Sequence, residues 1–140
     1  MTRTILTISQ EAALSIVPGG SAAGRLSVVV SPGYHVQANP ASDEFLIPLQ
    51  LEIQPRDGLR TGDPTYPPGQ PHRLEGTDSD LWIYTGTFEL LLPIMAAPSA
   101  VPGEYVLDGS LRYQACDSRS CLAPTSVPVE IAVRVGLGPE

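Results

Sequence analysis

The stretch from Gly24 to Ser31 reads GRLSVVVS, and the stretch from Phe45 to Ile53 reads FLIPLQLEI. In the first, Leu26, Val28 and Val30 alternate with residues that can face away from a core. Successive side chains of a β-strand point to opposite faces, so this period of two predicts strands with one buried face. The pattern, with β-branched residues, predicts strands at Thr4–Ser9, Gly24–Ser31, Phe45–Ile53, Leu81–Pro93, Gly103–Tyr113 and Val127–Val135.

Turn-forming residues separate these segments. The chain of 140 residues holds 13 Gly and 15 Pro, spread along its length, as in Pro32-Gly33 and Pro102-Gly103. Helical periodicity is nearly absent, and only Glu11 to Ile16 suggests a short helical turn. Six or seven short strands with regular turns predict one all-β domain over residues 1–140, an immunoglobulin-like antiparallel β-sandwich.

One segment, Pro55 to Asp80, has scarcely an apolar residue and is predicted to be a single long loop. Loops of this length in compact domains are uncommon, and many are lids or binding loops. The sequence leaves open whether this one binds a partner or is a tolerated surface insertion.

The charge balance argues against nucleic acid as a partner. The chain has 15 acidic residues against 8 basic ones, which are all Arg, and its net charge is −7. An acidic surface repels phosphates. No apolar run reaches the length of a membrane span, and the first eight residues lack the apolar region of a secretory signal. We therefore expect either a cytosolic protein or one whose signal has been removed.

The two cysteines lie close together in Tyr113–Pro124, which reads YQACDSRSCLAP. If the flanking strands form a hairpin, Cys116 and Cys121 can approach within disulfide distance. A ring of about six residues would stabilise the fold by only about 2 kcal/mol in the entropic model. A short, exposed pair suits thiol exchange, because an attacking sulfur must reach it. Spacing alone leaves three readings open: a redox pair, a structural disulfide or two unlinked thiols, and a metal site.

Other chemistry has weaker support. Zinc usually takes four ligands, and beyond the cysteines the chain offers only His35 and His72, each expected to be a surface or hydrogen-bonding residue. Nucleophile elbows, phosphate loops and zinc-protease motifs are absent. Arg119 would favour a thiolate, whereas Asp117 would oppose it. Trp82 and Tyr84 are expected to be core or flank residues, or to cover a reactive sulfur.

Several further segments stand out: PGYHVQANP at Pro32–Pro40, FLIPL at Phe45–Leu49, Tyr66-Pro67, IYTG at Ile83–Gly86, and LRYQAC at Leu111–Cys116 with Cys121 and Pro124. Together they resemble a known family, the N-terminal periplasmic domain of the thiol:disulfide interchange protein DsbD. The resemblance extends from Gly24 to Val135.

This resemblance implies an immunoglobulin-like fold with a catalytic cysteine pair on a hairpin at one end. By resemblance, Cys121 forms the mixed disulfide with a partner and Cys116 resolves it. The domain would act as a protein-disulfide reductase component without a cofactor or a metal, taking electrons from a thioredoxin-like donor and passing them to oxidised periplasmic proteins of the thioredoxin fold. A membrane-embedded domain could belong to the same native chain. The location implied is periplasmic or extracytoplasmic.

The resemblance also implies a cap that shields the cysteines, at a position matching Glu75 to Asp80. That stretch contains no aromatic residue, so we expect Asp78 and Asp80 to be joined by Leu81 or Trp82 in shielding. Residues of the matching segments or between the cysteines should surround the pair: Tyr34, His35, Tyr113, Arg119 and Pro124. The rival hypothesis is a non-catalytic immunoglobulin-like binding module, with a structural hairpin disulfide and the long loop as its contact surface.

Overall fold

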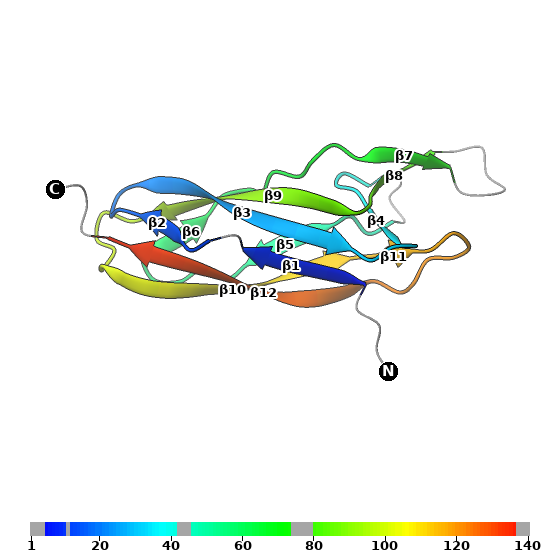
Figure 1. The fold of residues 1–140 in the computed structure, drawn as a ribbon. Helices are drawn as coiled ribbons and strands as arrows, with labels where there is room; N and C mark the ends of the chain where they lie inside the picture. The colour runs from blue at the N-terminus through cyan, green and yellow to red at the C-terminus, as the bar shows by residue number, and fades with distance from the viewer. Residues whose placement is uncertain (1–4, 11, 42–45, 74–79, 137–140) are drawn as a thin grey trace.

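The computed structural model describes residues 5–10, 12–41, 46–73 and 80–136, which form β-strands joined by turns and loops (Figure 1). The strands are β1 Leu6–Gln10, β2 Leu14–Ile16, β3 Ser21–Val30, β4 His35–Gln37, β5 Gln50–Ile53, β6 Leu59–Thr61, β7 Gln70–Arg73, β8 Asp80–Tyr84, β9 Thr87–Ala96, β10 Gly103–Tyr113, β11 Ala115–Cys116 and β12 Thr125–Val135. In these ranges no helix is long and apolar enough to cross a membrane.

Two sheets form the body of a sandwich, with strand orders β1-β3-β9-β6 and β2-β12-β10-β5. A third sheet, of order β11-β4-β8-β7, extends one end of this body, as Figure 1 shows. All strand pairs are antiparallel except β2 with β12, which is parallel. The predicted all-β sandwich is confirmed, with a separate small sheet at one end.

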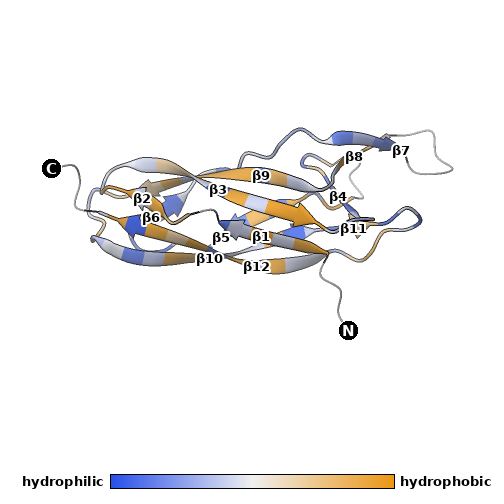
Figure 2. Ribbon diagram, in the orientation of Figure 1, coloured by the Kyte–Doolittle hydropathy of each residue, from blue (hydrophilic) through white to orange (hydrophobic). Residues whose placement is uncertain are grey.

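The core lies between the two large sheets, and the predicted alternation of side chains is confirmed there. The inward set of β3, Leu26, Val28 and Val30, is nearly inaccessible to solvent, and β9, β10 and β12 contribute matching sets. Figure 2 shows this apolar character along β3 and β9, in contrast to the hydrophilic β7. Burial of these side chains supplies the main driving force for folding.

Three predicted elements outside the long loop differ from the structure. The segment predicted as a strand over Phe45–Ile53 is a strand only from Gln50, although Leu49 and Leu51 are buried as expected; Phe45 lies outside the described residues. The segment Leu81–Pro93 belongs to two strands, because the chain turns at Gly86, whose φ of 64° favours glycine. The predicted helical turn is wrong, since Leu14–Ile16 is β2 and pairs with Val133–Val135 of β12.

The segment predicted as one long loop contains two strands, β6 and β7. Leu59 is buried, and β6 extends the first sheet by pairing with the end of β9. The polar strand β7 pairs with β8 in the small sheet. Strand β6 forms through pairing with the distant β9, whereas β7 pairs with the next strand along the chain. Neither short and mostly polar sequence indicates a strand by itself.

Candidate functional site

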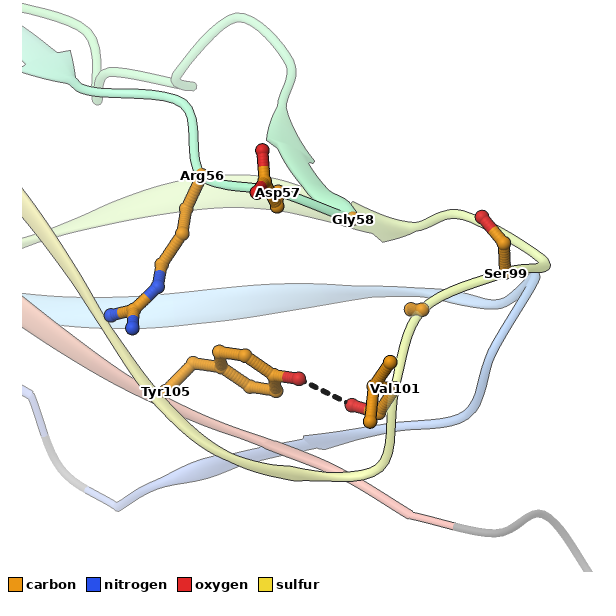
Figure 3. A pocket seen from close by; sticks show the side chains of 7 residues that line it. Arg56, Asp57, Gly58, Ser99, Val101 and Tyr105 are labelled. Carbon is orange, nitrogen blue, oxygen red and sulfur yellow. Dashed lines mark hydrogen bonds between the residues drawn. The ribbon is translucent and has the colours of Figure 1, made fainter.

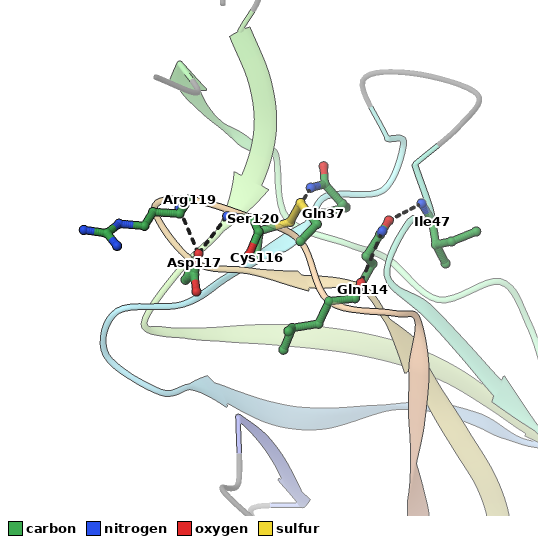
Figure 4. Close-up of a disulfide and its surroundings, with 9 residues drawn as sticks. Gln37, Ile47, Gln114, Cys116, Asp117, Arg119 and Ser120 are labelled. Carbon is green, nitrogen blue, oxygen red and sulfur yellow. Dashed lines mark hydrogen bonds between the residues drawn. A yellow bond between two sulfur atoms is a disulfide. The ribbon is translucent and has the colours of Figure 1, made fainter. Parts of the chain in front are cut away.

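The two cysteines lie in the loop of a hairpin, at the end of the molecule that carries the small sheet. Strands β10 and β12 pair along their whole lengths, and Tyr113 faces Thr125 where the loop begins. Within the loop, Cys116 and Cys121 form a disulfide, with their Cα atoms 3.9 Å apart (Figure 4). The predicted hairpin is confirmed, and it brings the two sulfurs together.

The two halves of the disulfide have opposite environments. Cys116 belongs to β11, which pairs with β4 so that Cys116 faces His35 and Ala115 faces Val36. This pairing buries Cys116 completely, whereas Cys121 is exposed. The expectation of an exposed pair is therefore wrong for Cys116, because the small sheet covers that residue.

Gln37 contacts the buried sulfur. Its side chain is fully buried, and its Nε2 donates a hydrogen bond of 3.5 Å to Sγ of Cys116 (Figure 4). Its Oε1 has no hydrogen-bond partner in the described part of the chain. Gln37 was not among the site residues predicted from the sequence. Gln37 is two residues after His35, so both side chains lie on the same face of β4. This spacing is the feature of the sequence that could have predicted Gln37 as a site residue.

His35 is buried rather than at the surface, and its ring contacts that of His72 with 4.6 Å between centroids. Its Nε2 has no hydrogen-bond partner among the described residues. The predicted surface position is therefore wrong for His35. Burial lowers the pKa of His35, and His72 lowers it further, while Asp117 acts in the opposite direction. The sequence did not reveal that His72, from β7, reaches this site.

Asp117 organises the backbone between the cysteines. Its Oδ1 accepts hydrogen bonds from the backbone N–H groups of Arg119 and Ser120, each 2.8 Å long. These two bonds, more than the nearby charges of Arg119 and His35, lower the pKa of the Asp117 carboxyl. The backbone N–H of Asp117 in turn donates to the carbonyl of Ser120, which closes a tight turn.

The other residues expected around the cysteines are more dispersed. Tyr113 is buried in the core of the sandwich, and burial raises the pKa of its hydroxyl. Tyr34 is half-buried and packs against the same core. Arg119 and Pro124 are exposed on the cysteine loop. Gln114, not predicted, connects this loop to its surroundings, because it accepts a hydrogen bond from the Ile47 N–H and donates one to the Leu122 carbonyl.

Of the residues predicted to shield the cysteines, Leu81 and Trp82 lie on β8, next to β4 in the small sheet. Leu81 is half-buried and pairs with His72, while Trp82 is 46% exposed. Asp80 is the first residue of β8, and Asp78 lies outside the described residues. Tyr84 is buried in the core, which was one of the two positions expected for Trp82 and Tyr84. Shielding stays a prediction.

No three His, Cys, Asp or Glu side chains gather in a metal-binding arrangement in the ranges that the structure describes. A hollow of about 600 Å³ lies at the opposite end of the sandwich, between Gly58, Ser99 and Tyr105 (Figure 3). There Arg56 donates to the Val106 carbonyl and lies over the Tyr105 ring, 5.3 Å from its centroid. The Arg56 side chain is thus bound to the protein itself, through a backbone carbonyl and an aromatic ring.

Comparison with known proteins assigns the family. The family model "Thiol:disulfide interchange protein DsbD, N-terminal" matches residues 2–132. The N-terminal periplasmic domain of ScsB from Proteus mirabilis superposes with a TM-score of 0.58 at 12% identity, covering 90% of this chain and 44% of that one. This superposition supports the sandwich fold. The chain spans less than half the length of the ScsB structure.

A family 123 glycoside hydrolase from Clostridium perfringens reaches a TM-score of only 0.44 at 9% identity, over 94% of this chain and 27% of that one. No curated protein sequence matches the chain. The family model covers nearly the whole described sandwich and both cysteines, so the chain belongs to the family of the N-terminal domain of the thiol:disulfide interchange protein DsbD.

Proposed function

We propose that this domain relays reducing equivalents through the Cys116–Cys121 disulfide, from a thioredoxin-like donor to oxidised extracytoplasmic proteins. The observation that carries the proposal is the difference in burial within the disulfide. Cys121 is open to solvent, whereas Cys116 is fully enclosed. A disulfide placed only to fix a hairpin has no need of one accessible and one protected sulfur.

The difference in access determines which sulfur reacts. Thiol–disulfide exchange requires a thiolate to attack one sulfur while the other leaves. An external thiolate can approach Cys121 but not Cys116, so Cys121 forms the mixed disulfide and Cys116 is the leaving group. This assignment agrees with the one that the family resemblance implies.

The electron balance follows from these two roles. A donor thiolate bonds to Cys121, and the electron pair of the broken S–S bond passes to Cys116. The donor's second thiolate then attacks the donor sulfur and releases Cys121, leaving a donor disulfide and a reduced domain. In the next half-reaction, Cys121 attacks an acceptor disulfide and Cys116 resolves the mixed disulfide, which restores the Cys116–Cys121 bond. Two electrons and two protons pass to the acceptor.

The acceptors and donor are proposed to be thioredoxin-fold proteins, as the family resemblance implies. Such partners carry their own reactive cysteine pair, which the stepwise exchange requires. An oxidising compartment such as the periplasm is the place where imported reducing equivalents are useful.

The first test is the equilibrium reduction potential of the pair, measured in glutathione buffers by thiol trapping and intact mass. We expect a reversible midpoint within roughly −180 to −270 mV, the range of exchanging proteins. A disulfide that resists reduction until the protein unfolds would overturn the proposal and favour the non-catalytic binding module.

A matched pair of variants tests the roles of the cysteines. With oxidised glutathione as the probe, Cys116→Ser should form a mixed disulfide at Cys121 readily, and Cys121→Ser should react far more slowly because Cys116 is buried. Equal rates would contradict the assignment. The reduced wild-type domain should also reduce oxidised protein disulfide isomerase, a thioredoxin-fold protein whose potential of about −180 mV makes it an acceptor, and intact mass would report the transfer.

A further inference from the structure

The fully buried Gln37 is the starting point. Two hydrogen bonds hold the main chain of Gln37: its N–H donates to the Gln114 carbonyl, and its carbonyl accepts from the Leu49 N–H. The side chain therefore projects from a fixed backbone, and its Nε2 lies 3.5 Å from Sγ of Cys116. The donor is in place before any reaction begins.

In the oxidised protein, the hydrogen bonds of the Gln37 side-chain amide are weak or missing. A disulfide sulfur is a weak hydrogen-bond acceptor, and the Oε1 of Gln37 has no partner among the described residues. Burying an amide that is only partly satisfied is unfavourable. A leucine or methionine at this buried position would stabilise the oxidised state more than glutamine does. The amide therefore favours another redox state of the cysteine pair.

That state arises when the disulfide opens. Attack on Cys121 places the electron pair on Sγ of Cys116, and a neutral acceptor becomes an anion. Hydrogen bonds to an ionised acceptor are about twice as strong as those between neutral groups. The same N–H that meets a weak acceptor before the attack thus meets a strong one after it.

We infer that Gln37 stabilises the Cys116 thiolate, and so accelerates opening of the disulfide at Cys121. The inference rests on the proposed function and adds a residue to it. Leaving thiols of lower pKa depart faster, so a donor at Cys116 also reinforces the choice of Cys121 as the attacked sulfur.

Within residues 5–10, 12–41, 46–73 and 80–136, four charged or titratable groups concern the argument about Cys116. His35 faces it from β4 and carries His72 of β7 against its own ring. Asp117 follows it directly, with the carboxylate bonded to the backbone of the loop, and Arg119 is exposed. A protonated His35 would also favour the thiolate, so the effect of Gln37 should be measured above the pH at which His35 is protonated.

The test is Gln37→Met, which keeps the length of the side chain and removes its donor. In a Cys121→Ser background, the pKa of the Cys116 thiol, followed by thiolate absorbance, should rise by about one unit, a tenfold loss of thiolate. With both cysteines present, opening of the disulfide by dithiothreitol should slow about threefold, as the Brønsted dependence of exchange predicts. Gln10→Met is the matched control, because the side-chain amide of Gln10 bonds to the Ala132 backbone on β12, away from the cysteines.

The outcomes separate this inference from the proposed function. If the wild-type disulfide exchanges but Gln37→Met changes neither the pKa nor the rate, the inference is overturned while the proposed function stands. If the wild-type disulfide does not exchange in the folded protein, the proposed function itself fails. Should Gln37→Met not fold, the side-chain amide resonances of Gln37 in the reduced wild-type protein should shift with the titration of Cys116, and their invariance would overturn the inference.

Discussion

The imidazole rings of His35 and His72 lie against each other, with centroids 4.6 Å apart and planes inclined at 46°. The two residues come from β4 and β7, and His35 is the cross-strand partner of Cys116. Burial and the neighbouring ring both disfavour a charge on His35 and lower its pKa, against a smaller opposing effect of Asp117. The folded domain therefore holds a neutral imidazole beside its disulfide strand.

The first prediction is that the domain loses stability in mild acid because of His35. In the unfolded chain His35 titrates near 6.5, and in the folded chain its pKa is lower. Between these values the unfolded state binds the extra proton, so the free energy of unfolding decreases as the pH falls from about 6.5, by at most about 1.4 kcal/mol per pH unit. Urea unfolding between about pH 5 and pH 7.5 measures this slope.

The variant His35→Gln should flatten that slope. His72→Gln should keep this slope but over a narrower pH range, because His72 no longer lowers the pKa of His35. An unchanged slope in His35→Gln would assign the pH dependence to another group.

The second prediction concerns the two ends of the disulfide. Cys121→Ala should retain the β circular-dichroism signal and lose about 2 kcal/mol, the entropic value for so small a ring. Cys116→Ala should lose about 1–3 kcal/mol more, because it also leaves a void and removes the sulfur that Gln37 contacts. Denaturant unfolding of both variants gives the comparison, and equal losses would contradict the burial of Cys116.

The long strands could be predicted from sequence because their alternation is local. In Gly103–Tyr113 and the adjoining Thr125–Val135, every second residue is apolar or small, and the structure pairs these strands as a hairpin. The cysteines lie in the loop between them, so the hairpin and the position of the pair followed directly. Both features depend on residues close in the sequence.

The burial of Cys116 could not be predicted in this way. It depends on β4, some eighty residues earlier in the sequence, which pairs with only two residues of β11. The contact of His35 with His72 likewise depends on β7, whose polar sequence QPHR gives no strand signal. Where pairing is short and distant in sequence, the pattern of a single segment does not indicate it.

The third prediction tests whether part of the segment predicted as a loop is structural. Leu59 of β6 is 1% exposed and packs in the core beside the end of β9. Leu59→Ala should lower the free energy of unfolding by about 2–5 kcal/mol, as for other buried leucines. The exposed neighbour Arg60 is the control, and Arg60→Ala should change stability by no more than about 0.5 kcal/mol. Similar effects of both changes would mean that β6 is not anchored.

The last prediction concerns Asp117, whose carboxylate holds the backbone between the cysteines by accepting from the N–H groups of Arg119 and Ser120. Asp117→Ala removes both acceptors, so hydrogen exchange at these two amides should accelerate, by up to about tenfold per bond lost. The exposed Asp108 on β10 offers a control, since Asp108→Ala should leave both amides unchanged.

Acid should reproduce the effect of Asp117→Ala in the wild-type protein. The pKa of Asp117 is held below 3.8 in the folded state, so its stabilising contribution is complete above that pH and is lost as the pH falls through the lower, folded-state pKa. The amide resonances of Arg119 and Ser120 should therefore move in the wild-type protein below about pH 3.8 and stay still in Asp117→Ala. Resonances that move equally in both proteins would mean that another group controls the loop.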